Sequence, residues 1–168
     1  MALDPVVYDW IVFVHIFGVF VFLIAHGVSS GVGFRLAKER NRERVSALLE
    51  FSRSSYRVMI LGFWWILSTG FVLGYAGDWW TMRWFWAAIV TLIVLAGLMT
   101  PLAAIPYNWV RAIVGLRAPL RRKPLPAPPS NTDADLTAAL DWISPIPAAA
   151  VGMIGIAFLL WLMMFKPF

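Results

Sequence analysis

Long apolar runs alternate with short polar segments along the chain, and this pattern predicts membrane-spanning helices. A helix needs about 20 apolar residues to cross the hydrocarbon core of a bilayer. Four runs reach that length, at about residues 10–34, 58–76, 84–109 and 145–165. The sequence therefore predicts an all-α fold, in which a single integral membrane domain over residues 1–168 forms a bundle of four transmembrane helices.

Composition supports a membrane protein and narrows its chemistry. Of the 168 residues, 61% are hydrophobic and only 14% are charged, whereas soluble domains are about 45–50% apolar. The chain has no cysteine, which excludes disulfides, zinc–thiolate sites and iron–sulfur clusters. The N-terminal MALDPVVYDW contains no Lys or Arg, so we expect no cleavable signal peptide.

The positive charges predict how the chain is oriented. All 14 Lys and Arg residues except Arg83 and Lys166 fall in the two long connections, residues 35–57 and 110–141. Because cytoplasmic loops are enriched in Lys and Arg, we expect both basic loops in the cytoplasm and both termini on the non-cytoplasmic side. The chain is thus expected to be a multi-pass protein of a prokaryotic inner (plasma) membrane. Its net charge of +5 could by itself suggest nucleic acid. Because the basic residues flank apolar spans, we instead expect a lipid bilayer as partner and no nucleic acid.

The connections and helix ends carry signals of their own. In NRERVSALLEF, one apolar face and a cap at Asn41 predict a short amphipathic helix that lies at the interface or extends span two. The proline-rich RRKPLPAPPSNTDADL predicts an extended, mobile loop with no core of its own. Pro101 and Pro106 are expected to bend the third span. Ser144 is expected to cap the fourth span, with Pro145 at its first helical position.

The only two histidines of the chain, His15 and His26, lie within FVHIFGVFVFLIAHG in span one. Eleven residues make three helical turns plus about 20°, so both imidazoles point nearly the same way and lie roughly 16 Å apart along the axis. One metal cannot be bound by both, and two sites at different depths are predicted. Lipid offers imidazole no hydrogen-bond partner, so this face is expected to look into the bundle.

A tetrapyrrole such as haem is the cofactor that these histidines suggest. A second axial ligand from the same chain would have to be methionine, because no further His or Cys is available. Two methionines are predicted at the depth of His26, two indoles near that level would wall a flat pocket, and an arginine at the inner boundary can bind a propionate or an anionic headgroup. The candidate cofactor-binding residues, with both histidines as candidate haem-iron ligands, are His15, His26, Met99, Met153, Trp64, Trp65 and Arg35.

Structural roles compete with each of these assignments. Methionine and tryptophan side chains can simply fill an uneven core, and Arg35 can act as a snorkelling anchor. A proton relay has less support, because no Asp or Glu lies within a span. Apart from the histidines, no ionisable residue is expected to be buried. The histidines themselves can bond to hydroxyl groups of neighbouring spans, for which the sequence offers Ser68, Thr69, Thr91 and Thr100.

The sequence leaves two classes of function open. No phosphate-binding loop, dinucleotide fingerprint, nucleophile elbow or zinc-protease helix is present, so no catalytic residue is identified and any enzymatic activity would be that of a membrane oxidoreductase. Membrane electron transfer by a bound haem is one predicted function. The other is a non-catalytic accessory or assembly subunit of a larger respiratory or photosynthetic complex, whose histidines merely pack. Other membrane subunits or a homo-oligomer are the expected protein partners.

The first span, VHIFGVFVFLIAHGVSSGVGFRL, resembles a superfamily of small four-helix membrane proteins. This superfamily includes the copper-resistance protein D (CopD) domain, an uncharacterised predicted integral membrane family and HemJ-type protoporphyrinogen oxidases. The features shared are a Val-His-Ile start at His15, a glycine at Gly18 or Gly27, and an Arg-Leu exit at Arg35 and Leu36. The following RNRERVSALLEFSRSSYR resembles the basic linker of the uncharacterised branch.

This resemblance implies a haem b site with His15 as ligand, and quinone-linked or porphyrinogen redox chemistry. The likeness covers topology throughout the chain, but specific residues only in its first third. HemJ-type proteins place an arginine closer to the first histidine, and CopD-like copper handling would want more Met or His at the outer face. The identity of an enzyme is therefore not implied.

Overall fold

The computed structural model describes residues 4–126, 128 and 130–168. Within this part, the chain is helical and contains no strand, which confirms the all-α prediction; one isolated bridge joins Arg117 and Pro124. The helices are α1 (Pro5–Leu36), α2 (Arg42–Ala76), α3 (Arg83–Met99), α4 (Ile105–Ile113), α5 (Asp133–Asp141) and α6 (Pro145–Phe165), with the short helical segments η1 (Trp79–Thr81) and η2 (Thr100–Ala104).

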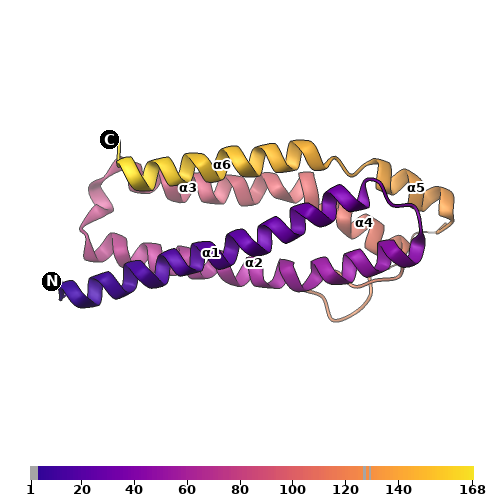
Figure 1. Cartoon of the computed structure of the whole chain (residues 1–168), viewed down its shortest axis with the longest axis horizontal. Coiled ribbons are helices and arrows are strands. Elements are labelled where there is room, and N and C mark those ends of the chain that lie inside the picture. Colours follow the sequence, from indigo (N-terminus) through magenta and orange to yellow (C-terminus); the bar gives the residue numbers. More distant parts are fainter. Residues whose placement is uncertain (1–3, 127, 129) are drawn as a thin grey trace.

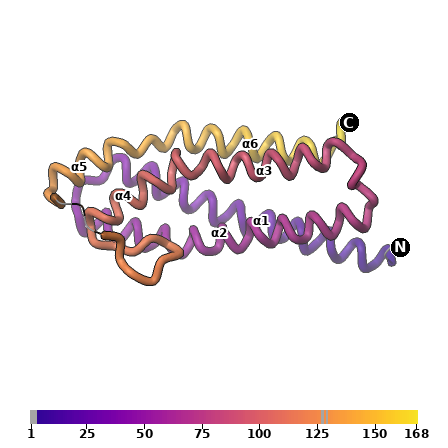
Figure 2. Tube along the Cα trace, turned by 180° about the vertical axis from the view of Figure 1, so that it is seen from behind, coloured from indigo at the N-terminus to yellow at the C-terminus, as the bar shows by residue number. Residues whose placement is uncertain are grey.

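The helices form an elongated bundle made of two pairs. Helix α1 runs along α2, and α3 runs along α6, as both views show (Figures 1 and 2). The two ends of the chain lie at one end of the bundle, and α5 lies at the other (Figure 1). Four segments are long and apolar enough to cross a membrane, consistent with a multi-pass membrane protein: Pro5–Leu36, Arg42–Ala76, Arg83–Ile113 and Asp133–Phe165.

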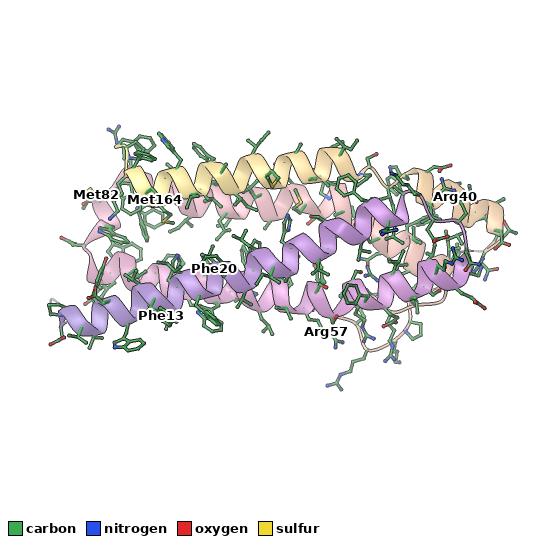
Figure 3. The ribbon with its side chains drawn as sticks, in the orientation of Figure 1. Phe13, Phe20, Arg40, Arg57, Met82 and Met164 are labelled. Carbon is green, nitrogen blue, oxygen red and sulfur yellow. The ribbon has the colours of Figure 1, made fainter. Side chains whose placement is uncertain are left out.

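The outside of this bundle is apolar. Phe13 and Phe20, which Figure 3 labels on α1, have exposed fractions of 58% and 61%. Large aromatic side chains exposed to this degree along a helix would be unfavourable in water, but they are favourable against lipid acyl chains. The surface therefore agrees with the spans predicted from hydropathy.

Helix caps explain where the first two long helices begin. The Asp4 carboxylate accepts a hydrogen bond from the Val6 N–H at 2.8 Å, ahead of Pro5 at the start of α1. The Asn41 side chain accepts from the Arg44 N–H at 3.1 Å, as predicted. The amphipathic segment after Asn41 continues without a break into span two. Of the two predicted arrangements, it therefore extends span two and does not form a separate helix.

The third span is interrupted where prolines predicted a bend. Segment η2 is a π-helical turn that begins at Thr100 and includes Pro101, and α4 follows with Pro106 in its first turn. In this turn the Ile105 N–H bonds to the Thr100 carbonyl, five residues earlier. Proline lacks an N–H and clashes with the preceding turn, so the local hydrogen-bond ladder widens. At the fourth span Pro145 is at the start as predicted, but the predicted Ser144 cap is wrong, because its side chain makes no capping bond.

The connection between α4 and α6 differs from the extended loop predicted for it. Its last part folds into α5, which starts with a capping box between Thr132 and Asp135. Leu136 and Leu140 are four residues apart and therefore share one face of α5, and both are fully buried. Their partners come from other elements, so this helix is stabilised by tertiary packing that composition does not reveal.

Basic residues of the α1–α2 turn hold α5 in place. Arg40, labelled beside α5 in Figure 3, pairs with Asp141 at 2.6 Å, and Arg42 pairs with Asp133 at 3.3 Å. Arg42 also donates to the Ile113 carbonyl at 3.1 Å. These side chains are partly exposed, so each pair contributes little by itself, but together they fix the position of the connection.

The buried core consists of two clusters, one towards each end of the bundle. The cluster at the end that holds both termini contains Trp84, Phe85, Ala88 and Leu162. The cluster at the end that holds α5 contains Val32, Leu36, Val45, Leu49, Tyr107, Val110, Ile113, Leu136, Ala139, Leu140 and Ile143. Most residues that line the candidate site come from the stretch of helices between these clusters, and the site overlaps the second cluster at Tyr107.

Candidate functional site

A cavity of about 380 Å³ lies inside the bundle, between α1, α2, the α3–α4 span and α6. We call it the bundle cavity. Most of its lining is aliphatic or aromatic, and the polar side chains that line it, apart from His26, gather mainly towards the end of the bundle that holds α5. Its volume falls in the range of about 300–1,000 Å³ that is usual for small-molecule and cofactor sites.

His26 lines the bundle cavity from α1. Its imidazole stacks on Phe22, one turn earlier, with ring centroids 5.9 Å apart and an interplanar angle of 10°. Among the described residues, no side chain or backbone group makes a hydrogen bond to this imidazole. His26 is thus a polar group directed at an apolar space, and that combination is unfavourable unless something in the space binds it.

Gly152 of α6 keeps the space beside this imidazole free. A Cβ atom at this position would lie 2.9 Å from Nε2 of His26, closer than Cβ contacts normally are. Any other residue would therefore press on the ring nitrogen that is available to bind a ligand. The absence of a side chain at Gly152 preserves room next to His26.

Two further predicted residues meet His26 at the bundle cavity. Met99, near the end of α3, and Trp64, on α2, both line it. This arrangement agrees with the prediction that both side chains lie at about the depth of His26 in the bundle. A thioether, an imidazole and part of an indole thus line one apolar space from three different helices, although Trp64 has an exposed fraction of 59%.

The other predicted site residues lie elsewhere. Met153 has an exposed fraction of 72%, on the outside of α6, and Arg35 is exposed near the end of α1. Trp65 packs over Gly18 of α1, where a Cβ atom would lie 2.9 Å from its Cδ1. These three side chains do not line the bundle cavity.

His15 is held by a neighbouring hydroxyl and does not line the bundle cavity. Its Nδ1 lies 2.7 Å from Oγ1 of Thr69 on α2, one of the partners that the sequence offered. The same hydroxyl donates to the Trp65 carbonyl at 2.8 Å, so it accepts a hydrogen bond from His15 Nδ1–H. This bond fixes the orientation of the ring and leaves Nε2 as the nitrogen with a lone pair.

A buried arginine lies at the α5 end of the bundle cavity. Arg111 of α4 has an exposed fraction of only 3%, so the expectation that no ionisable residue other than the histidines is buried is wrong. Its guanidinium donates to Ser52 Oγ at 2.7 Å, to the Leu49 carbonyl at 3.3 Å and to Asn108 Oδ1 at 3.4 Å. One turn earlier, the Tyr107 hydroxyl donates to the Ser29 carbonyl at 3.3 Å.

Sequence reasoning assigned Arg111 to the charges of the cytoplasmic loop and so missed it. A single arginine at the end of an apolar span usually anchors the helix at the membrane surface. One signal was available, because Arg111 follows Tyr107 by four residues and Val110 by one, on the apolar side of α4. That spacing places its side chain on the inner face of the helix.

The donor set fits a haem better than a bare metal ion. Among the described residues, no group of three or more His, Cys, Asp or Glu side chains is placed to hold a metal ion. Haem iron takes four ligands from its own macrocycle, and one histidine or a histidine and a methionine complete its coordination. A single free imidazole, a thioether and a large apolar space therefore suit a tetrapyrrole.

No protein-family model, curated protein or solved structure matches the chain. The resemblance of span one to CopD/HemJ-like proteins therefore stays a prediction.

Proposed function

We propose that this protein is an integral membrane protein that binds haem b, or a related tetrapyrrole, through His26 and serves membrane electron transfer. The observation that carries the proposal is the imidazole of His26, which lines an apolar cavity of about 380 Å³ and has no hydrogen-bond partner among the described residues. A flat apolar ring with a central metal satisfies both features at once, because it fills the space and binds the nitrogen.

The residues of the bundle cavity divide this task. His26 would ligate the haem iron, Met99 is the candidate for a second ligand, and Trp64 would lie beside the ring. Haem, when bound, supplies a one-electron carrier whose potential depends on its ligands and on burial. The surrounding apolar side chains exclude water, and Gly152 keeps the space beside His26 free.

The proposal includes the orientation of the chain in a prokaryotic inner membrane. The end of the bundle with α5 is placed in the cytoplasm, and the end with both termini is placed on the opposite side. The basic residues of the α1–α2 turn and of the α4–α5 connection support this orientation, because they gather at the α5 end. His26 then lies in the cytoplasmic half of the bilayer.

A visible absorption spectrum tests the proposal. Wild-type protein, purified after reconstitution with haem, should show a Soret band that is absent from the His26→Ala variant. The His15→Ala variant should keep the band, although its thermal stability should fall because the hydrogen bond between His15 and the Thr69 hydroxyl is lost. Circular dichroism of each variant confirms that it is folded.

Two outcomes contradict this assignment in different ways. A wild-type protein that stays colourless when haem is supplied would refute the haem proposal. A Soret band that His15→Ala removes and His26→Ala preserves would move the ligand to the position that the family resemblance implies.

A further inference from the structure

Among the described residues, Arg111 is the only charged one that lines the bundle cavity. Its exposed fraction of 3% means that water solvates very little of the guanidinium. A buried charge is strongly unfavourable unless an opposite charge and good hydrogen bonds compensate for it. The charges and hydrogen-bond partners around Arg111 therefore indicate which kind of ligand the bundle cavity can bind.

No carboxylate of the described residues forms an ion pair with Arg111. The nearest acidic residue along α2, Glu50, instead pairs with Arg53 at 3.5 Å. The partners of Arg111 are a carbonyl, a hydroxyl and an amide oxygen, which offer dipoles and no negative charge. They accept three of its five N–H groups, so two remain for another acceptor.

The hydrogen bonds also fix where the guanidinium stands. The Ser52 hydroxyl donates to the Leu49 carbonyl at 3.0 Å, so its oxygen is free to accept from Arg111. This small network ties the end of the arginine side chain to α2. The charge is therefore held at the α5 end of the bundle cavity, while the apolar lining extends away from it towards His26.

A second hollow, next to the bundle cavity, is strongly basic. It shares the lining residues Ile60, Pro119 and Leu120 with the bundle cavity, so the two adjoin. Figure 3 labels one of its arginines, Arg57, beside the loop that forms this shared wall. Positive charge beside a cavity raises the local concentration of anions. The arginines that line this hollow are Arg53, Arg57, Arg117, Arg121 and Arg122.

From these observations we infer that the bundle cavity binds an amphipathic acid, whose apolar body fills the space and whose carboxylate or phosphate pairs with Arg111. This inference goes beyond the proposed function, because it names the class of ligand and holds whether or not the ligand carries iron. Two sources supply such an acid: the propionates of a porphyrin, and the headgroup of an acidic membrane lipid. In both cases the acidic group lies at the α5 end of the bundle.

Matched pairs of acidic and neutral ligands test the inference on the full chain in detergent. One pair is haem and haem dimethyl ester, followed by their Soret bands. The other is a diazirine-labelled fatty acid and the corresponding alcohol, followed by crosslinking and peptide mapping. Wild-type protein should prefer at least one acid over its neutral partner by about tenfold or more, because only the acid compensates the buried charge.

Variants assign this preference to Arg111. The Arg111→Gln variant should lose the preference for the acid and still bind the neutral partner, whereas Arg111→Lys should keep most of it. The Arg44→Gln variant removes an equal charge from an exposed position and should behave like wild type. The comparison of each acid with its neutral partner in wild-type protein does not depend on whether the variants fold.

The outcomes separate the two sources and the two proposals. A preference for haem over its ester identifies a porphyrin, and a preference for the fatty acid over the alcohol identifies a lipid. A lipid preference without haem binding would refute the haem proposal and support this one. Equal binding of acid and neutral partner in both pairs, or a preference that survives in Arg111→Gln, would overturn the inference.

Discussion

A hydroxyl on the neighbouring helix distinguishes the two histidines of α1. The ring of His15 is oriented by Thr69, and the ring of His26 is supported only by stacking on Phe22. Helical spacing places both imidazoles on one face, but the residue opposite each one decides its chemistry. Metal-binding histidines usually have a partner on the other ring nitrogen, and at His26 water or the ligand would have to provide it.

Adding one methyl group at Gly152 should disturb the site without replacing either proposed ligand. The Gly152→Ala variant places a Cβ atom 2.9 Å from His26 Nε2, so the end of this side chain has to shift. Moving the imidazole away from the position proposed to bind haem weakens binding by up to about 1–3 kcal/mol. Haem affinity, measured by titration of the Soret band, should therefore fall roughly tenfold or more.

Gly97→Ala is the matched control for that substitution. Its Cβ atom would meet nothing within 4 Å, so it makes the same change of residue in a helix without new contacts. Equal haem affinity of the two alanine variants would show that the space beside His26 is not used by a ligand.

The sequence predicts the depth of a side chain in the bundle well, but it does not predict the direction in which that side chain points around its helix. Counting 1.5 Å per residue gives the depth of a side chain, and Met99 and Trp64 do share the bundle cavity with His26. Rotation about the helix axis is set by packing against neighbours, which a single sequence does not contain. Met153 is therefore exposed on the lipid side, although its depth was suitable.

At the scale of elements, the tight turn between α1 and α2 depends on a single carboxylate. Glu39 accepts hydrogen bonds from the N–H groups of Arg40 and Asn41, both at 3.0 Å. The Asn41 N–H and then the Arg40 N–H lower the pKa of Glu39 below its ordinary value. Asn41 in turn caps α2, so the carboxylate helps to set the start of the longest helix.

This turn should loosen in acid. Because folding lowers the pKa of Glu39, its contribution is fully present above the unfolded pKa of about 4.3 and is lost as the pH falls through the lower, folded value. Hydrogen exchange at the Arg40 and Asn41 amides, corrected for the intrinsic effect of pH, should speed up in that range. In Glu39→Gln these amides should exchange fast at neutral pH and lose most of this pH dependence.

Glu43→Gln serves as the control for the turn, because Glu43 lies in the first turn of α2 and is exposed. It should retain slow exchange at both amides. If Glu39→Gln and Glu43→Gln exchange alike, the carboxylate of Glu39 does not hold the turn.

The elements themselves were predictable to different degrees. The bounds expected for the fourth span, 145–165, coincide with α6, because Pro145 marks its start and hydropathy is high throughout. The helix α5 was not predicted, because the prolines before it dominate the composition of the connection. Its burial depends on leucines of α1 and α2, such as Leu36 and Leu49, that are distant in sequence.

At the scale of the whole molecule, two helix pairs enclose a cavity between two packed ends. The outer surface is apolar along the length of the bundle, and all basic residues except Arg83 and Lys166 belong to the end of α1, the α1–α2 turn, the adjoining part of α2, α4 and the α4–α5 connection. The bundle therefore has an interior that can hold a ligand. It also has an uneven distribution of positive charge between its two ends, which can orient the protein across a membrane.

The orientation can be measured with single cysteines, because the natural chain has none. A membrane-impermeant maleimide added to intact cells should label the Thr81→Cys variant, whose residue lies in the exposed turn near the termini. It should label the Arg44→Cys variant only after the cells are lysed. The reverse pattern would invert the proposed topology and place His26 in the outer half of the bilayer.

The π-helical turn η2 has a consequence for changes in chain length. Met99 and Arg111 are twelve residues apart, and in a regular helix of 100° per residue they would point about 120° apart. A π-turn accommodates one additional residue, which reduces the difference to about 20°, and both side chains line the same cavity. A variant that lacks one residue within Thr100–Ala104 can close this turn into a regular helix and keep both side chains on one face. Deletions elsewhere in the span would turn Arg111 away from the space it now faces.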